Sequence, residues 1–175
     1  MASTGRHLNI WGKRWGNIGK TGFEDTYSNT PGDQLFLGSS ANYAYYDCPG
    51  SEISFTTTIT GGIYLLRCDV HSYLTSTGGG NGINYCFRFN GTQVGGTNGS
   101  SSAAGDTWQR GGHGDSDHVG CFSINRMYVV QPGLTAGTTV TANVMAGHWG
   151  SAELYHNYPN YATYSDFYVE EFAPL

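Results

Sequence analysis

Two histidines and two aspartates lie within one short glycine-rich segment, His113-Gly114-Asp115-Ser116-Asp117-His118. Imidazoles and carboxylates are ligands that divalent metals take in proteins. The spacing matches no zinc motif, however, and the Asp-x-Asp lacks the Gly and the distal Glu of a calcium loop. We therefore expect a solvated polar loop and no cofactor. A receptor or subunit contact through His113 and His118 is the second interpretation, and a metal site shared by three chains is the third.

Aromatic side chains gather in a second segment near the C-terminus. Exposed aromatic rings stack on sugar faces or anchor protein interfaces. Three uses stay open: a subunit interface, which we favour, contact with a sugar or receptor, and packing inside the domain. Trp108, in the polar stretch 96–118, is a further candidate. The candidate contact residues are therefore Trp108, Trp149, Tyr155, Tyr158 and Tyr161.

No arrangement typical of an enzyme is found. Ser, His and Asp are all present, but there is no nucleophile elbow. Glu170 and Glu171 are adjacent, and neighbours on a strand point to opposite faces, so they cannot form the facing carboxylates of a glycosidase. The Gly-rich stretches lack the Lys-Ser/Thr of a phosphate loop. We predict a non-enzymatic protein.

Basic residues are concentrated at the N-terminus. Residues 1–22 hold four of the eight Lys and Arg and no acid, so they carry +4 and the remainder carries 4 − 13 = −9. Two Trp in the same segment are too apolar to be left in water. We expect residues 1–47 to be an arm that attaches the protein to a particle or a neighbouring subunit. The candidate attachment residues are Arg6, Trp11, Lys13, Arg14, Trp15 and Lys20.

The composition narrows the class of protein. A chain of 175 residues suffices for one domain. Its 27 Gly, 13 Tyr and low charged fraction of 12% favour strands and turns over amphipathic helices. The net charge of −5 argues against a nucleic-acid partner. Because neither a secretory signal nor a long apolar stretch is seen, we expect synthesis in a host cytoplasm and no membrane insertion.

Four cysteines, Cys48, Cys68, Cys86 and Cys121, have no CxxC spacing. That pattern is typical neither of a zinc ribbon nor of a dense disulfide scaffold. We predict reduced thiols, most of them buried in the core.

Alternating residues from position 51 onward predict strands bounded by Gly-rich turns. Asn90-Gly91 is a strong signal for a hairpin with a type I′ turn. Seven or eight short strands imply an all-β antiparallel sandwich, most naturally a jelly roll. The expected strands are 52–60, 63–74, 83–89, 92–95, 119–130, 138–146 and 165–172.

Four stretches carry a family resemblance over roughly residues 50–173. They are FTTTITGGIYLLRCDV (Phe55 to Val70), FRFNGTQVGG (Phe87 to Gly96), INRMYVVQPGLTAGTTVTANV (Ile124 to Val144) and YSDFYVEEF (Tyr164 to Phe172). Their order resembles that of the trimeric jelly-roll domains at phage tail-fibre tips and on virion surfaces, with a complement/tumour-necrosis-factor-like fold. The resemblance implies a homotrimer and brings no catalytic motif.

The leader before this region is short and has no heptads or shaft repeats, so a separately encoded protein is favoured over a fibre tip. We expect residues 48–175 to be the jelly roll. The hypothesis is a capsid decoration (cement) protein of a tailed phage that contacts the major capsid protein or another virion protein. The alternative is a tail-fibre tip that binds a glycan or protein of the host surface.

Overall fold

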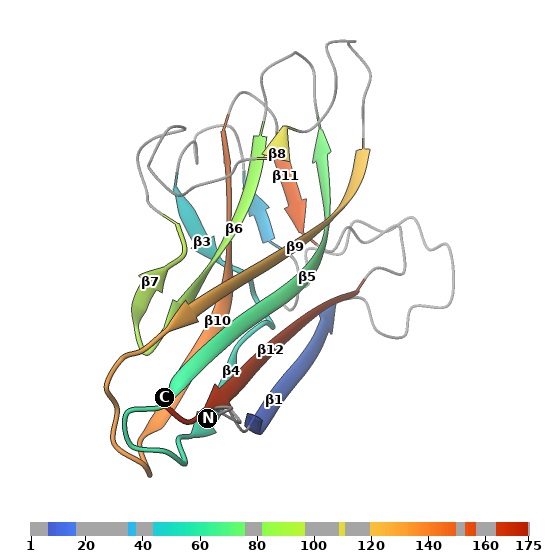
Figure 1. The fold of residues 1–175 in the computed structure, drawn as a ribbon. Coiled ribbons are helices and arrows are strands. Elements are labelled where there is room, and N and C mark those ends of the chain that lie inside the picture. Colours follow the sequence, from blue (N-terminus) through green and yellow to red (C-terminus); the bar gives the residue numbers. More distant parts are fainter. Residues whose placement is uncertain are drawn as a thin grey trace, which may run out of the picture.

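In a computed structural model the chain forms two antiparallel β-sheets packed face to face (Figure 1). The residues described contain no helix, so the predicted all-β sandwich is confirmed. No membrane-spanning helix is found among them either. The structure describes residues 7–16, 35–37, 44–75, 82–96, 109–110, 120–149, 153–156 and 164–174.

Sheet A follows the order β1-β12-β5-β9, and each neighbouring pair is antiparallel. Two short strands extend this sheet. β11 pairs with the C-terminal end of β5, and β2 pairs with β11. The strands of sheet A are β1 (His7–Gly16), β2 (Leu35–Leu37), β5 (Ile63–Thr75), β9 (Gly120–Val130), β11 (Glu153–His156) and β12 (Tyr164–Phe172).

Sheet B follows the order β3-β10-β6-β7, with β4 beside the other end of β10 and β8 beside β6. The strands of sheet B are β3 (Tyr45–Asp47), β4 (Ile53–Thr56), β6 (Gly82–Phe89), β7 (Thr92–Val94), β8 (Gln109–Arg110) and β10 (Thr139–Trp149).

Successive strands change sheet in the order of a jelly roll. The chain passes from β1 in sheet A to β3 and β4 in sheet B, back to β5, on to β6 and β7, and then through β9, β10 and β12. This order forms two Greek keys in one sandwich. Asn90 and Gly91, with φ of 49° and 79°, make the tight turn between β6 and β7, as the sequence predicts.

The core lies between the sheets and is built by alternate residues. On β5 the buried residues are Tyr64, Leu66, Cys68 and Val70, the face that alternation predicts. Phe87 of β6 and Phe167 of β12 stack across the sheets with ring centroids 5.7 Å apart. Such a pair adds about 0.5–1.5 kcal/mol to the apolar area it buries.

Strand β1 closes one open side of the sandwich. Trp11 stacks on Phe55 of β4, with ring centroids 4.3 Å apart. Lys13 Nζ donates to the carbonyl oxygen of Glu52 at 3.2 Å, which adds a polar link from sheet A to sheet B. Residues 7–16 are therefore an edge strand, although the sequence indicated no regular element there. The reason is that the inward positions are occupied by Asn9, Trp11 and Lys13, which gives no apolar alternation.

Strand β9 closes the opposite side. The Arg126 guanidinium donates through Nε to the carbonyl oxygen of Tyr85 on β6 at 3.1 Å. Tyr128 packs over Gly95, where an added Cβ would lie 3.0 Å from the ring and where φ is +76°. Glycine is required at that position both for its backbone conformation and for the close approach of the ring.

Candidate functional site

Part of the outer face of sheet B is covered by the chain itself. Tyr45, Cys86 and Met145 point away from the main core and still form a second buried cluster. Gly96 lies so close above it that a Cβ there would be 2.7 Å from that of Cys86. Asn84, also buried, donates to the Tyr45 hydroxyl at 2.7 Å. This part of the face is closed, whereas Arg88 and Asp47 further along it are exposed and paired with each other.

The outer face of sheet A carries exposed side chains at its two edges. Ile10 on β1 is 56% exposed, and Met127 and Val129 on β9 are 66% and 59% exposed. Between them the Arg67 side chain of β5 is 46% exposed. Contact surfaces usually have an apolar centre and a polar rim; this face has the reverse order, with large apolar side chains around a polar centre.

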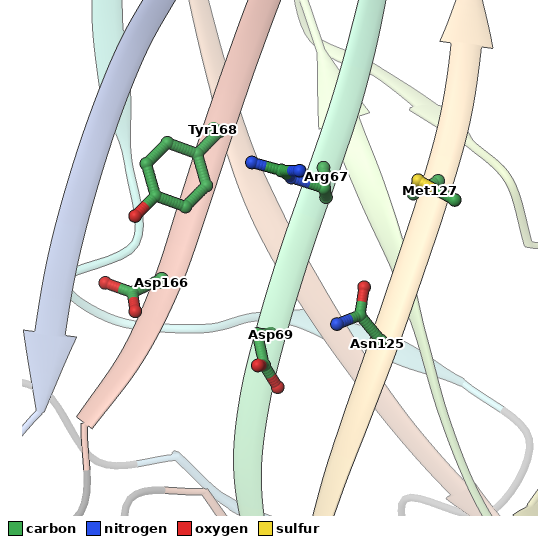
Figure 2. A pocket seen from close by; sticks show the side chains of 6 residues that line it. All are labelled: Arg67, Asp69, Asn125, Met127, Asp166 and Tyr168. Carbon is green, nitrogen blue, oxygen red and sulfur yellow. The ribbon is translucent and has the colours of Figure 1, made fainter.

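A hollow of about 360 Å³ opens at the centre of this face (Figure 2). The pairing registers place its lining in two rows that cross three strands. One row is Asp166, Asp69 and Asn125, and the next is Tyr168, Arg67 and Met127. Figure 2 shows the first row as polar groups side by side, with the Tyr168 ring and the Met127 thioether on either side of Arg67.

The charges of the hollow are arranged asymmetrically. The Arg67 guanidinium lies over the Tyr168 ring, 5.1 Å from its centroid, and 3.7 Å from the Glu170 carboxylate. The two aspartates of the other row are direct cross-strand neighbours. One row therefore offers carboxylate acceptors, and the other offers guanidinium donors beside apolar surface.

Gly12 fixes the position of Tyr168. The two residues are partners in the β1–β12 register, and a Cβ on Gly12 would lie 2.8 Å from the ring. A side chain at position 12 would have to displace the ring. Glycine on β1 therefore lets Tyr168 lie along the rim of the hollow.

Glu171, near the C-terminal end of β12, is a second polar centre. Its carboxylate accepts hydrogen bonds from the Thr58 amide at 3.0 Å, the Ile59 amide at 3.3 Å and the Tyr64 hydroxyl at 3.0 Å. The Thr58 hydroxyl and Asn9 Nδ2 donate as well. The side chain is fully buried, and every donor belongs to the same chain, so its role is structural.

Ionisation at Glu171 is set by two opposing effects. Burial by itself raises the pKa of the carboxyl, but the hydrogen bonds from Thr58, Tyr64 and Asn9 outweigh it and hold the pKa below its ordinary value. Burial and the bond to this carboxylate raise the pKa of the Tyr64 phenol. Glu171 is therefore ionised and Tyr64 protonated in the folded protein at neutral pH.

The structure places some of the sequence-predicted site residues and not others. Trp11 stacks on Phe55 of β4, and Lys13 bonds to the carbonyl oxygen of Glu52, the residue before β4. Register alone places Arg14 opposite Asp166 and Trp15 opposite Ser165, and likewise Trp149 opposite Gly82 and Tyr155 opposite Tyr73. Seven predicted residues lie outside the described part of the chain: Arg6, Lys20, Trp108, His113, His118, Tyr158 and Tyr161.

The described residues include no group of three or more His, Cys, Asp or Glu that could hold a metal ion. The predicted cluster at positions 113–118 lies outside them. Its use as a metal or contact site stays a prediction.

Cys48, Cys68 and Cys86 are buried and form no disulfide, which confirms the predicted reduced thiols at these three positions. Burial raises the pKa of Cys48 and of Cys68 well above the ordinary thiol value. Because the thiolate is the reactive form, we expect iodoacetamide to leave all three unmodified in the native protein and to label them in urea. Peptide mass spectrometry gives the readout, and native-state labelling of any of the three would contradict it.

The sequence matches no protein-family model and no curated protein. Solved structures that are similar over nearly the whole chain include two at 8% identity each. Dimeric latent PorU from Porphyromonas gingivalis has a TM-score of 0.41 over 98% of this chain. The VP2 subviral particle of infectious bursal disease virus has a TM-score of 0.36 over 95%. This chain spans 14% and 38% of those chains, and likenesses of this degree carry no functional conclusion.

Proposed function

We propose that this protein is a non-enzymatic structural protein of a virus particle, displayed on the particle surface. The observation that supports the proposal is the difference between its two faces. On the outer face of sheet B the apolar side chains of Tyr45, Cys86 and Met145 are buried. On the outer face of sheet A, Ile10, Met127 and Val129 are exposed around a polar hollow. A jelly roll with large apolar side chains exposed on one face suits a protein that acts by contact.

The finer proposal is a homotrimeric capsid decoration protein of a tailed phage. The acidic body and the four basic residues among positions 1–22 favour electrostatic attachment to a major capsid protein or another virion protein. Lys13 is already bonded to the carbonyl oxygen of Glu52. We therefore assign attachment first to Arg6 and Lys20.

Charge reversal tests this proposal without disturbing β1. We expect the native protein to sediment as a trimer and to co-sediment with purified phage particles stripped of surface proteins. The double variant Arg6→Glu/Lys20→Glu is expected to bind them at least tenfold more weakly, since each reversal replaces attraction by repulsion. Arg110→Glu, a reversal elsewhere in the chain, serves as the matched control. A monomer, or equal binding by both variants, would contradict the proposal.

A receptor-binding tip of a tail fibre is the second candidate function. The hollow on sheet A favours it, because charged, amide and aromatic groups converge there on one accessible spot. Binding of labelled protein to host cells without binding to particles would support this candidate over decoration.

A further inference from the structure

We propose that the hollow on the outer face of sheet A is a binding site for one ring of a neutral saccharide. The inference rests on the second candidate function and names its ligand class. It does not depend on decoration, because binding at this face and attachment through the N-terminal segment use different residues.

The polar groups of the hollow match the hydroxyls of a sugar. A sugar hydroxyl both donates and accepts, so it pairs well with an acceptor and a donor that lie close together. Asp69 and Asp166 supply carboxylate oxygens, Asn125 supplies both kinds of group, and Arg67 donates from the neighbouring row. All four side chains lie within two rows of a rigid sheet, which fixes their spacing before any ligand binds.

The charge of the lining selects the ligand class. Asp69 and Asp166 outnumber the Arg67 guanidinium in the lining, and Glu170 approaches that guanidinium. Arg14 lies opposite Asp166 in the β1–β12 register, so carboxylates still outnumber cations here, which disfavours an anionic sugar. Tyr168 and Met127 offer apolar surface to the C–H face of a ring. The hollow, at about 360 Å³, is near the lower end of the roughly 300–1,000 Å³ of small-molecule sites. A neutral hexopyranose fits these conditions better than a sialylated or sulfated sugar.

The test uses the full chain and an immobilised array of neutral oligosaccharides with their sialylated and sulfated counterparts. We expect binding to a subset of the neutral members, confirmed by titration with the corresponding free methyl glycoside. Asp69→Asn/Asp166→Asn keeps the shape of both side chains and is expected to weaken binding at least tenfold. Asp47→Asn removes an exposed carboxylate from sheet B that bonds to Arg88 and is expected to leave binding unchanged.

Other outcomes would overturn the proposal. These are an absence of binding across the array, binding restricted to anionic glycans, and equal binding by the double variant. If the double variant instead changes the sedimentation coefficient, the hollow is a contact between copies of the chain and not a saccharide site. Circular dichroism of each variant checks the fold, and Asn125→Ala provides a second variant if the double change alters it. Particle co-sedimentation is measured separately, so failure of one proposal leaves the other standing.

Discussion

Replacing Glu171 by Ala is expected to lower the free energy of unfolding by roughly 3–5 kcal/mol, because several donors lose their shared acceptor at once. The change leaves the Thr58 and Ile59 amides and the Tyr64 hydroxyl without the acceptor they share. A buried donor that loses its partner costs about 1–3 kcal/mol. Urea unfolding at neutral pH, followed by tryptophan fluorescence, measures the effect.

Glu170→Ala is the matched control for that experiment. Glu170 is the next residue along β12, on the opposite face, and its carboxylate lies 3.7 Å from the half-exposed Arg67 guanidinium. The Arg67 side chain is 46% exposed and that of Glu170 16%, so the pair is partly hydrated. Its loss should cost about 0–1 kcal/mol, well below the loss expected for Glu171→Ala. Equal losses for the two variants would show that Glu171 is not the centre of the network.

The same network predicts a direction for the pH dependence. The pKa of Glu171 in the folded protein lies below its ordinary value of 4.5, so the unfolded chain takes up a proton first as the pH falls. Its stabilising contribution is therefore complete above about pH 4.5 and is lost as the pH falls through the folded-state pKa. Glu171→Gln cannot titrate, so the gap between native and variant stability should narrow on acidification. A gap that stays constant down to about pH 3 would contradict the assignment.

Alternation alone predicted most strands and the inward faces. On β12, Phe167 and Val169 point inward and Asp166 and Tyr168 outward, as period-two patterning requires. The same period of two puts Glu171 on the inward side of β12. Its donors, Asn9, Thr58 and Ile59 among them, are distant in sequence, so no local pattern could identify the network.

The hollow could not be predicted for the same physical reason. Its six residues come from β5, β9 and β12, and only the pairing register brings them into two rows. A shift of one residue in any strand would send its members to the core face. The sequence contained one usable signal, the polar residues that alternate with buried ones on β5 and β12, but nothing that paired Asp69 with Asp166.

Strand β1 is a regular element that the sequence pattern did not predict. Gly and Asn recur through residues 1–47, which suggested an arm without regular structure. Nine residues of β1 nevertheless have register partners on β12, and Trp11 packs against the core. An edge strand needs only one neighbouring strand and one buried side chain. Neither requirement produces an alternating pattern of apolar residues in the sequence.

Deleting residues 1–16 is therefore expected to unfold the protein, whereas deleting residues 1–6 should leave it folded. The longer deletion removes the stacking of Trp11 on Phe55 and the bond from Asn9 to Thr58. It also exposes the edge of β12 to other chains, which favours aggregation. Solubility, circular dichroism and thermal melting of the two truncated proteins give the comparison.

A point substitution isolates the contribution of the anchor. Trp11→Ala is expected to cost roughly 2–4 kcal/mol, somewhat less than the 3–5 kcal/mol of a fully buried aromatic, because Trp11 is only partly buried. Ile10→Ala, one residue away on the exposed outer face, should change stability by no more than about 0.5 kcal/mol. If the protein without residues 1–16 instead melts like the native one, β1 does not close the sandwich in solution, and those residues are free to reach a neighbouring subunit or particle.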